Sequence, residues 1–228
     1  MSTYVISDIH GEIDRFHSIL NLINFSDNDT LYFIGDAIDR GPEGVAILQE
    51  IMKTPNIKML LGNHEHMFMR YYAEDVTDIE IRRWNKNNNT PTKNAYLKLT
   101  ETEQKELMSF INSLPTHFDI EVNGRKFYLV HGFPGDNLHD EIWGRPMNGE
   151  KNPFADKTLI IGHTPVLYLM TVEENLARQI MDMTISGESV RILYTKEFID
   201  IDCGSGYLDV EPRRLACLRL EDMKEFYA

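Results

Sequence analysis

The sequence predicts an α/β fold built from parallel strand–helix–strand units. Three short apolar segments, at 3–7, 30–34 and 57–61, have the length and composition of buried strands. The two segments between them repeat apolar residues at helical spacing, and such alternation is typical of crossover units. A third observation is that each strand ends in a polar cluster flanked by glycine. Because ligands bind beyond the carboxyl ends of parallel strands, these clusters indicate a functional site at that edge.

The helices of the first half follow from the same apolar spacing. One helix is predicted over 13–23 and another over 43–53, each with apolar residues at steps of three and four. A third helix is expected from His64 onward. Residues 74–114 carry charge, an Asn-rich tract and a helical pattern over 101–114. We interpret 74–114 as a mostly helical insertion that lies across the mouth of the site.

The second half is expected to contain more strands. Two strands between 117 and 130 are joined by Asn123-Gly124, which is a strong hairpin signal. The segment 142–146 is expected to be a loop. Further strands are expected at 158–161, 190–195, 198–202 and 215–220, and one more helix at 173–181. No linker divides the chain, so we expect a single domain over 1–228.

The composition limits the classes of function. The 228-residue chain has a net charge of −13 and 42% hydrophobic residues, an ordinary balance for a globular domain. The charge argues against nucleic-acid binding by phosphate neutralisation, although bound cations can reverse the sign inside a cleft. Two cysteines are too few for a disulfide framework. Because the sequence has neither a membrane-spanning run nor a signal peptide, we expect a soluble cytoplasmic protein.

The polar cluster after the segment 30–34 carries the strongest chemical signal. Gly35 is followed by Asp36, Asp39 and Arg40, and Gly41 closes the loop. Carboxylates and guanidinium groups are rarely buried unless they are paired or bound to metal. Taken alone, the loop is equally well explained as a solvated turn with a local Asp–Arg pair. The clusters elsewhere in the chain favour the functional interpretation.

Metal-binding residue types follow the other strands. Asp8 and His10 leave the first strand on one side, because residues i and i+2 of an extended chain point the same way. A carboxylate oxygen beside an imidazole nitrogen suits a divalent transition metal. The remaining clusters supply Asn63 with His64, then His131, then His163.

Together these residues form a set of oxygen and nitrogen donors that is too large for one ion. The candidate ligands are Asp8, His10, Asp36, Asn63, His131 and His163. Paired metals roughly 3.5–4 Å apart generate a hydroxide nucleophile and clamp an in-line displacement at phosphorus. Asp36 is the natural bridge between them. His64 is free to protonate the departing oxygen while Asp39 holds its tautomer, and Arg40 and Arg145 are suited to bidentate binding of phosphate oxygens.

The motifs closely resemble those of calcineurin-like metallophosphoesterases of the phosphoprotein phosphatase type. The family patterns G/S-D-x-H-G, G-D-x-x-D-R-G, G-N-H-E, H-G and G-H-T occur in order, at 7–11, 35–41, 62–65, 131–132 and 162–164. The size and the Trp143-x-Arg145 pattern most resemble compact bacterial and phage serine/threonine protein phosphatases. The resemblance implies a four-layer fold in which a central β-sandwich of mixed sheets is flanked by helices.

The resemblance also divides the ligands between two divalent cations that share Asp36. Asp8, His10 and Asp36 would hold one cation, and Asp36, Asn63, His131 and His163 would hold the other. It implies that His64 and Asp39 form the acid pair and that Arg40 and Arg145 orient the phosphate. Mn²⁺ is the expected metal, and the ligand types also tolerate iron or zinc.

The substrate stays open between two classes. Leu61 stands where protein phosphatases of this family carry an Arg that binds phosphate, whereas symmetrical diadenosine tetraphosphatases often have an apolar residue there. We expect a hydrolase of phosphoserine, phosphothreonine or small phosphomonoesters, with dinucleoside polyphosphates as the alternative substrates. A third alternative is a non-catalytic interaction module on the same fold. Relatives of that kind would be expected to lack ligands that this chain retains.

Overall fold

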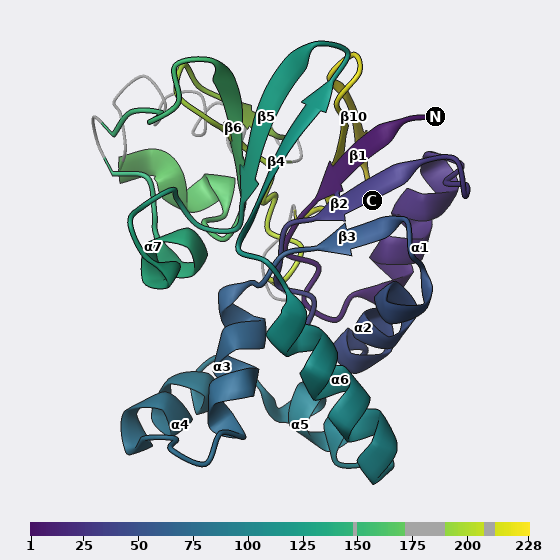
Figure 1. Ribbon diagram of the computed structural model, residues 1–228, viewed down its shortest axis with the longest axis vertical. Helices are drawn as coiled ribbons and strands as arrows, with labels where there is room; N and C mark the ends of the chain where they lie inside the picture. Colours follow the sequence, from purple (N-terminus) through teal and green to yellow (C-terminus); the bar gives the residue numbers. More distant parts are fainter. Residues whose placement is uncertain (148–149, 172–189, 208–212) are drawn as a thin grey trace.

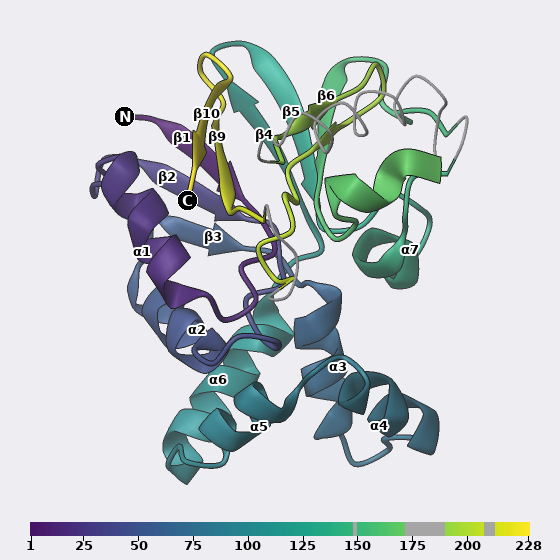
Figure 2. The ribbon, with the colours of Figure 1, turned by 180° about the vertical axis from the view of Figure 1, so that it is seen from behind.

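The computed structural model describes residues 1–147, 150–171, 190–207 and 213–228. These residues form two five-stranded sheets that pack against each other, with α1 and α2 covering the outer face of one sheet (Figures 1 and 2). Sheet A has the order β10-β9-β1-β2-β3, and sheet B has the order β4-β5-β6-β8-β7.

Both sheets are built from short strands. Sheet A contains β1 (Thr3–Ile6), β2 (Thr30–Phe33), β3 (Ile57–Met59), β9 (Ala216–Arg219) and β10 (Lys224–Tyr227). Sheet B contains β4 (His117–Val122), β5 (Arg125–Val130), β6 (Lys157–Ile161), β7 (Leu193–Tyr194) and β8 (Ile199–Asp200). The described helices are α1 (Ile13–Leu22), α2 (Gly44–Lys53), α3 (Asn63–Tyr71), α4 (Asp78–Asn85), α5 (Thr90–Tyr96), α6 (Glu101–Ser113), α7 (Leu138–Trp143) and the 3₁₀-helix η1 (Val166–Thr171).

Both sheets are mixed, as the family resemblance implied. In sheet A, β1 pairs with β2 in parallel and with β9 in antiparallel orientation. In sheet B, β5 pairs with β4 in antiparallel and with β6 in parallel orientation. The crossover units predicted from the first sixty residues form the parallel half of sheet A. The α/β fold class is therefore confirmed.

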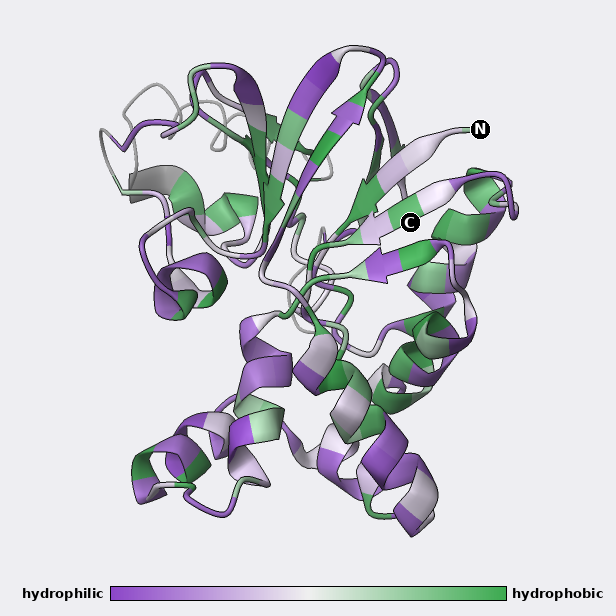
Figure 3. Ribbon diagram, in the orientation of Figure 1, coloured by the Kyte–Doolittle hydropathy of each residue, from purple (hydrophilic) through white to green (hydrophobic). Residues whose placement is uncertain are grey.

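Two apolar layers hold the sheets in place. Successive residues of a strand point to opposite faces, so Val5 enters the layer between the sheets while Tyr4 and Ile6 enter the layer beneath α1 and α2. Strands that are buried on both faces explain the continuous apolar runs in the sequence. Apolar residues are frequent on α1 and α2, whereas α3 and α4 are largely hydrophilic (Figure 3).

The segment 74–114 contains three helices, and two of them begin with reciprocal caps. The Thr77 side chain accepts a hydrogen bond from the N–H of Glu80, and the Glu80 carboxylate accepts one from the N–H of Thr77. Thr100 and Glu103 form the same arrangement at the start of α6. Such capping boxes satisfy two otherwise unpaired backbone donors, which explains why helices form in so polar a stretch.

Several sequence predictions differ from the structure. Ile142 and Trp143 belong to α7 instead of a loop, because the Asn137 side chain accepts the N–H of Asp140 and starts a helix there. The strand-like runs at 190–195 and 198–202 pair over only two residues each. Strand β10 was not predicted; it pairs along β9 after a turn at Met223 with positive φ. The helix predicted over 173–181 lies outside the described residues.

The helices in the described part of the chain include none with the length and apolarity needed to cross a bilayer.

Candidate metal centre

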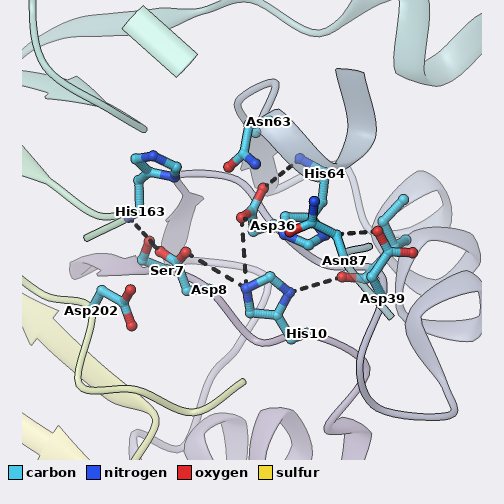
Figure 4. A network of polar contacts seen from close by, with 12 residues as sticks. Ser7, Asp8, His10, Asp36, Asp39, Asn63, His64, Asn87, His163 and Asp202 are labelled. Carbon is cyan, nitrogen blue, oxygen red and sulfur yellow. Dashed lines mark hydrogen bonds and ion pairs between the residues drawn. The ribbon is translucent and has the colours of Figure 1, made fainter. Parts of the chain in front are cut away.

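The carboxyl ends of β1, β2, β5 and β6 meet at one edge of the two sheets, beside the start of α3. All six predicted metal ligands are buried at this place: Asp8, His10, Asp36, Asn63, His131 and His163. Figure 4 shows the side chains from sheet A, α3 and His163 pointing toward Asp36. The structure therefore brings the strand-end residues together at one place.

Asp36 lies at the centre of the cluster. Its Oδ1 is 3.3 Å from Nε2 of His131, and its Oδ2 is 3.6 Å from Nε2 of His10 and 3.9 Å from Nε2 of His64. The other carboxylate, Asp8, has Oδ1 3.9 Å from Nε2 of His10. Its Oδ2 accepts hydrogen bonds from the Ser7 hydroxyl and, at 3.0 Å, from the N–H of His163.

The described residues contain two groups of donors that are close enough to share a cation. One group is His10, Asp36 and His64, and the other is Asp36, His131 and His163. Within each group the ligand atoms lie within 4.8 Å of one another, and Asp36 belongs to both. Asn63 adds an oxygen to the second group, since its Oδ1 is 3.0 Å from Nε2 of His131. This arrangement matches a pair of cations bridged by one carboxylate.

The donor atoms fit a cation better than they fit one another. Nδ1 of His10 lies 2.9 Å from the Ile38 carbonyl and Nδ1 of His131 lies 2.8 Å from the Ile34 carbonyl. A carbonyl only accepts, so each Nδ1 carries a proton, and loss of the second ring proton leaves the Nε2 lone pair able to bind a cation. Nε2 of each ring faces an oxygen of Asp36. Nε2 of His163 is buried and has no hydrogen-bond partner among the residues that the structure describes.

The pKa shifts reflect this crowding. Burial favours the neutral form of Asp36, but His131 and His64 outweigh it and lower its pKa well below the usual value. Burial lowers the pKa of His131, but the Asp36 charge outweighs it and raises that pKa to about 9. Burial, with Arg40, lowers the pKa of His10, and burial, with His131, lowers that of His163. His10 and His163 therefore remain neutral, as metal ligands must be.

The backbone around the cluster is strained. Six of the predicted site residues have positive φ, which is uncommon for residues other than glycine: Asp8 (50°), His10 (51°), Asp36 (63°), Asp39 (69°), Arg40 (66°) and His163 (65°). Conformations of this kind persist only where the surrounding structure enforces them, and they concentrate at functional sites.

Glu65 enforces the conformation of the Asp36 loop. Its fully buried carboxylate accepts hydrogen bonds from the N–H groups of Asp36 (2.9 Å), Ala37 (2.8 Å), Ile38 (3.3 Å) and Gly62 (3.2 Å). Burial and the Asp36 charge raise the pKa of Glu65 to about 7. The sequence places Glu65 inside the Gly-Asn-His-Glu motif, but the motif gives no indication that Glu65 supports the preceding strand-end loop.

The predicted acid pair is in direct contact. Nδ1 of His64 lies 2.7 Å from Oδ2 of Asp39, and both side chains are buried. Burial lowers the pKa of His64, but Asp36 and Asp39 outweigh it and give a net rise. Trp84 also donates a hydrogen bond to Asp39, at 2.8 Å. The Trp84 indole is fully buried.

The two predicted phosphate-binding arginines are close enough to the cluster to act on its histidines. The Arg40 charge contributes to the lowered pKa of His10, and the Arg145 charge contributes to the lowered pKa of His163. Nη1 of Arg145 donates a hydrogen bond to Thr164 at 2.9 Å. A further buried carboxylate, Asp202, lies beside Asp8 (Figure 4) and accepts the N–H of Gly204 at 2.9 Å. No role for Asp202 is predicted from the sequence.

Comparisons with known proteins agree with this geometry. A family model described as calcineurin-like phosphoesterase matches residues 1–194. Over 76 residues, 32% of the chain, the sequence is 46% identical to a symmetrical bis(5'-nucleosyl)-tetraphosphatase of Wigglesworthia glossinidia brevipalpis. A protein of the same name from Yersinia pestis (strain Pestoides F) is 40% identical over 75 residues, again 32% of the chain. The matches span only 28% and 26% of the lengths of these two relatives.

Two solved structures resemble the whole fold at low sequence identity. A metallophosphoesterase from Sphaerobacter thermophilus gives a TM-score of 0.57 at 18% identity, covering 100% of this chain and 86% of that one. A protein serine/threonine phosphatase from Saccharomyces cerevisiae with similarity to human PP5 gives 0.60 at 14% identity, covering 100% and 79%.

The support that Glu65 gives to the Asp36 loop predicts a large effect of Glu65→Gln on stability. The substitution places an amide donor against backbone N–H groups, so the free energy of unfolding of the metal-free protein should fall by about 1–3 kcal/mol. Glu103→Gln is the matched control, because Glu103 caps α6 in the same way but is only partly buried, and it should cost less than about 1 kcal/mol. Urea unfolding measures both. Equal losses in the two variants would contradict the role of Glu65.

Proposed function

Because the chain belongs to the calcineurin-like phosphoesterase family and is a hydrolase, we propose that it cleaves phosphoric esters with two divalent cations held around Asp36. The observation that carries the proposal is the convergence of imidazole Nε2 atoms and carboxylate oxygens on one buried point, where Nε2 of His163 has no hydrogen-bond partner among the described residues. Bound cations would balance the charge of such a buried set of donors.

The ligands divide into two sets that share Asp36. Asp8, His10 and Asp36 would hold one cation, since Oδ1 of Asp8 and Oδ2 of Asp36 both lie near Nε2 of His10. Asp36, Asn63, His131 and His163 would hold the other. Oxygen and imidazole donors suit Mn²⁺, and they also accept iron or zinc. When bound, two such cations lower the pKa of water toward neutrality and offset the negative charge of a phosphoryl group.

The remaining site residues bind the substrate and move a proton. Arg40 and Arg145 lie near the cluster and are suited to holding phosphate oxygens, because guanidinium groups bind such oxygens in pairs. His64 delivers a proton from Nε2 to the departing oxygen. Asp39 keeps the Nδ1 proton in place and stabilises the imidazolium form.

Dinucleoside polyphosphates are the substrate class that we place first. Leu61 is apolar and 6% exposed, so the position before Gly62 offers no phosphate-binding arginine. The two curated relatives reported above are named for symmetrical cleavage of dinucleoside tetraphosphates. This order reverses the expectation of a phosphoprotein substrate. Phosphoserine and phosphothreonine peptides are the second candidate. They are favoured by the Trp143-x-Arg145 pattern, which lies beside the site, since the ring centroid of Trp143 is 5.9 Å from that of His163.

An aromatic surface beside Arg40 supports the nucleotide class. Cζ of Arg40 lies 4.7 Å from the ring centroid of Tyr207, whose centroid is 5.4 Å from that of Tyr168. Tyr168 is 55% exposed. The surface adjoins the metal centre, since a Cβ at Gly206 would lie 2.1 Å from Cδ2 of His10. Exposed aromatic rings next to a phosphate-binding arginine are suited to stacking a base.

His64→Asn tests the proposed proton transfer. The variant should bind as much Mn²⁺ as the parent while its kcat on phenyl phosphate, an ester with a poor leaving group, falls about 10²–10⁴-fold. Metal content by mass spectrometry and steady-state kinetics are the measurements. His139→Asn is the control, because His139 is exposed and belongs to neither donor group. A His64→Asn enzyme with parental turnover would overturn the role of His64.

A substrate comparison with Tyr168→Ala tests the nucleotide assignment. The Mn²⁺-loaded parent should hydrolyse diadenosine tetraphosphate with a higher kcat/KM than a phosphoserine peptide. Loss of one stacking ring should raise KM for the dinucleotide about tenfold and leave the kinetics on an aryl phosphate unchanged. Tyr194→Ala, at a tyrosine on β7 that is 42% exposed, should change neither. If the parent instead preferred the phosphoserine peptide, phosphopeptides would replace dinucleoside polyphosphates as the first substrate class.

A further inference from the structure

The indole of Trp84 shares an acceptor atom with the proposed acid. Nε1 of Trp84 donates a hydrogen bond of 2.8 Å to Oδ2 of Asp39, and Nδ1 of His64 lies 2.7 Å from the same oxygen. Trp84 is 0% exposed and Asp39 is 0% exposed. The other carboxylate oxygen, Oδ1 of Asp39, is buried and has no hydrogen-bond partner within the described part of the chain. The two donors on Oδ2 are therefore the side-chain contacts that orient this carboxylate.

We propose that Trp84 is a positioning residue for proton transfer, which it controls by orienting Asp39 and, through Asp39, the ring of His64. The proposal rests on the function proposed above for His64. It makes the helical segment 78–96 part of the catalytic machinery, although the sequence suggested a separate insertion across the mouth of the site.

The same segment also fixes the backbone of the Asp39 turn. The N–H of Asp39 donates to the Thr92 hydroxyl at 2.8 Å, and the N–H of Arg40 donates to the Asn88 carbonyl at 3.0 Å. Asp39 and Arg40 have φ of 69° and 66°, a conformation that two successive residues other than glycine adopt only under constraint. Trp84, Asn88 and Thr92 thus hold this turn from one side.

Trp84 is itself held rigidly. Its ring centroid lies 4.7 Å from that of Tyr71, 5.7 Å from that of Phe68 and 6.2 Å from that of Tyr72. Aromatic rings packed at these separations and steep angles contribute to a well-defined side-chain orientation. The direction of the indole N–H is consequently set by packing against rings on α3 and at its C-terminal end.

The chemical effect follows from where the protons must lie. His64 acts as an acid at Nε2 only while Nδ1–H stays bonded to an ionised Asp39. A buried carboxylate is costly unless donors satisfy it, and the indole N–H supplies one of the two donors on Oδ2. Without it, Asp39 is held by His64 alone and the imidazole loses its fixed alignment toward the leaving oxygen.

Trp84→Phe separates this role from packing. Phenylalanine keeps an aromatic ring among Phe68, Tyr71 and Tyr72 but removes the N–H. Tyr72→Phe is the matched control, because it removes a polar group from the same aromatic cluster, and the Tyr72 hydroxyl is buried without a partner. Both variants are examined as full-length, Mn²⁺-loaded protein.

The first readout is the dependence of kcat on the leaving group. Protonation of the leaving oxygen matters for an alkyl phosphate and little for a nitrophenyl phosphate, whose leaving group is stable as an anion. Trp84→Phe should therefore lower kcat on the alkyl phosphate about tenfold at unchanged KM while kcat on the nitrophenyl ester stays within twofold. Tyr72→Phe should leave both within twofold. Equal losses on the two esters in Trp84→Phe, or no loss, would overturn the proposal.

The second readout does not depend on turnover. The Nδ1 proton of His64 should give a downfield proton resonance in the metal-free protein, identified by its absence in His64→Asn. Trp84→Phe should shift this resonance and Tyr72→Phe should not. If the parent hydrolysed neither ester, the proposed function would fail, and the resonance would still decide whether Trp84 orients the Asp39–His64 pair. An unshifted resonance in Trp84→Phe would overturn that orientation.

Discussion

The Asp36 carboxylate joins the two sheets into one site. It leaves the end of β2 in sheet A, and its Oδ1 lies 3.3 Å from Nε2 of His131, which follows β5 in sheet B. This contact requires the sheets to meet at a fixed separation. The apolar layer between them, to which Val5 and Ile34 contribute from one side and Phe127 from the other, sets that separation. Burial of that layer stabilises the fold and so offsets the free-energy cost of a crowded polar cluster at its edge.

The strained loops around Asp36 depend on supports that do not touch the substrate. Glu65 binds four backbone N–H groups of the β2 and β3 loops, and Trp84 binds the Asp39 carboxylate. Each support is a buried side chain, and the two come from different helices, Glu65 from α3 and Trp84 from α4. Preorganisation of this kind holds the metal ligands in position although their like charges repel one another. The helices α3 and α4 therefore matter to the site as much as the strands that carry the ligands.

The strands and the ligands were predictable because their signals are local. Apolar runs that end at Gly35, Gly62 or Gly162 indicate strand ends, and parallel crossovers bring such ends to one edge. The supports were not predictable in the same way. Trp84 lies 45 residues from Asp39 in the chain, and no local pattern links the two residues. Only the folded chain shows that the indole donates a hydrogen bond to that carboxylate. Strand β10 was missed because its pairing with β9 follows a turn at Met223 that carries no glycine.

The central claim is that two cations share Asp36. Anomalous X-ray diffraction from crystals grown with Mn²⁺ tests it most directly, because the signal locates the metal without reference to activity. Two peaks are expected on either side of the Asp36 carboxylate, one beside Asp8 and His10 and the other beside His131 and His163. A single peak, or peaks that leave Asp36 without a metal contact, would contradict the claim.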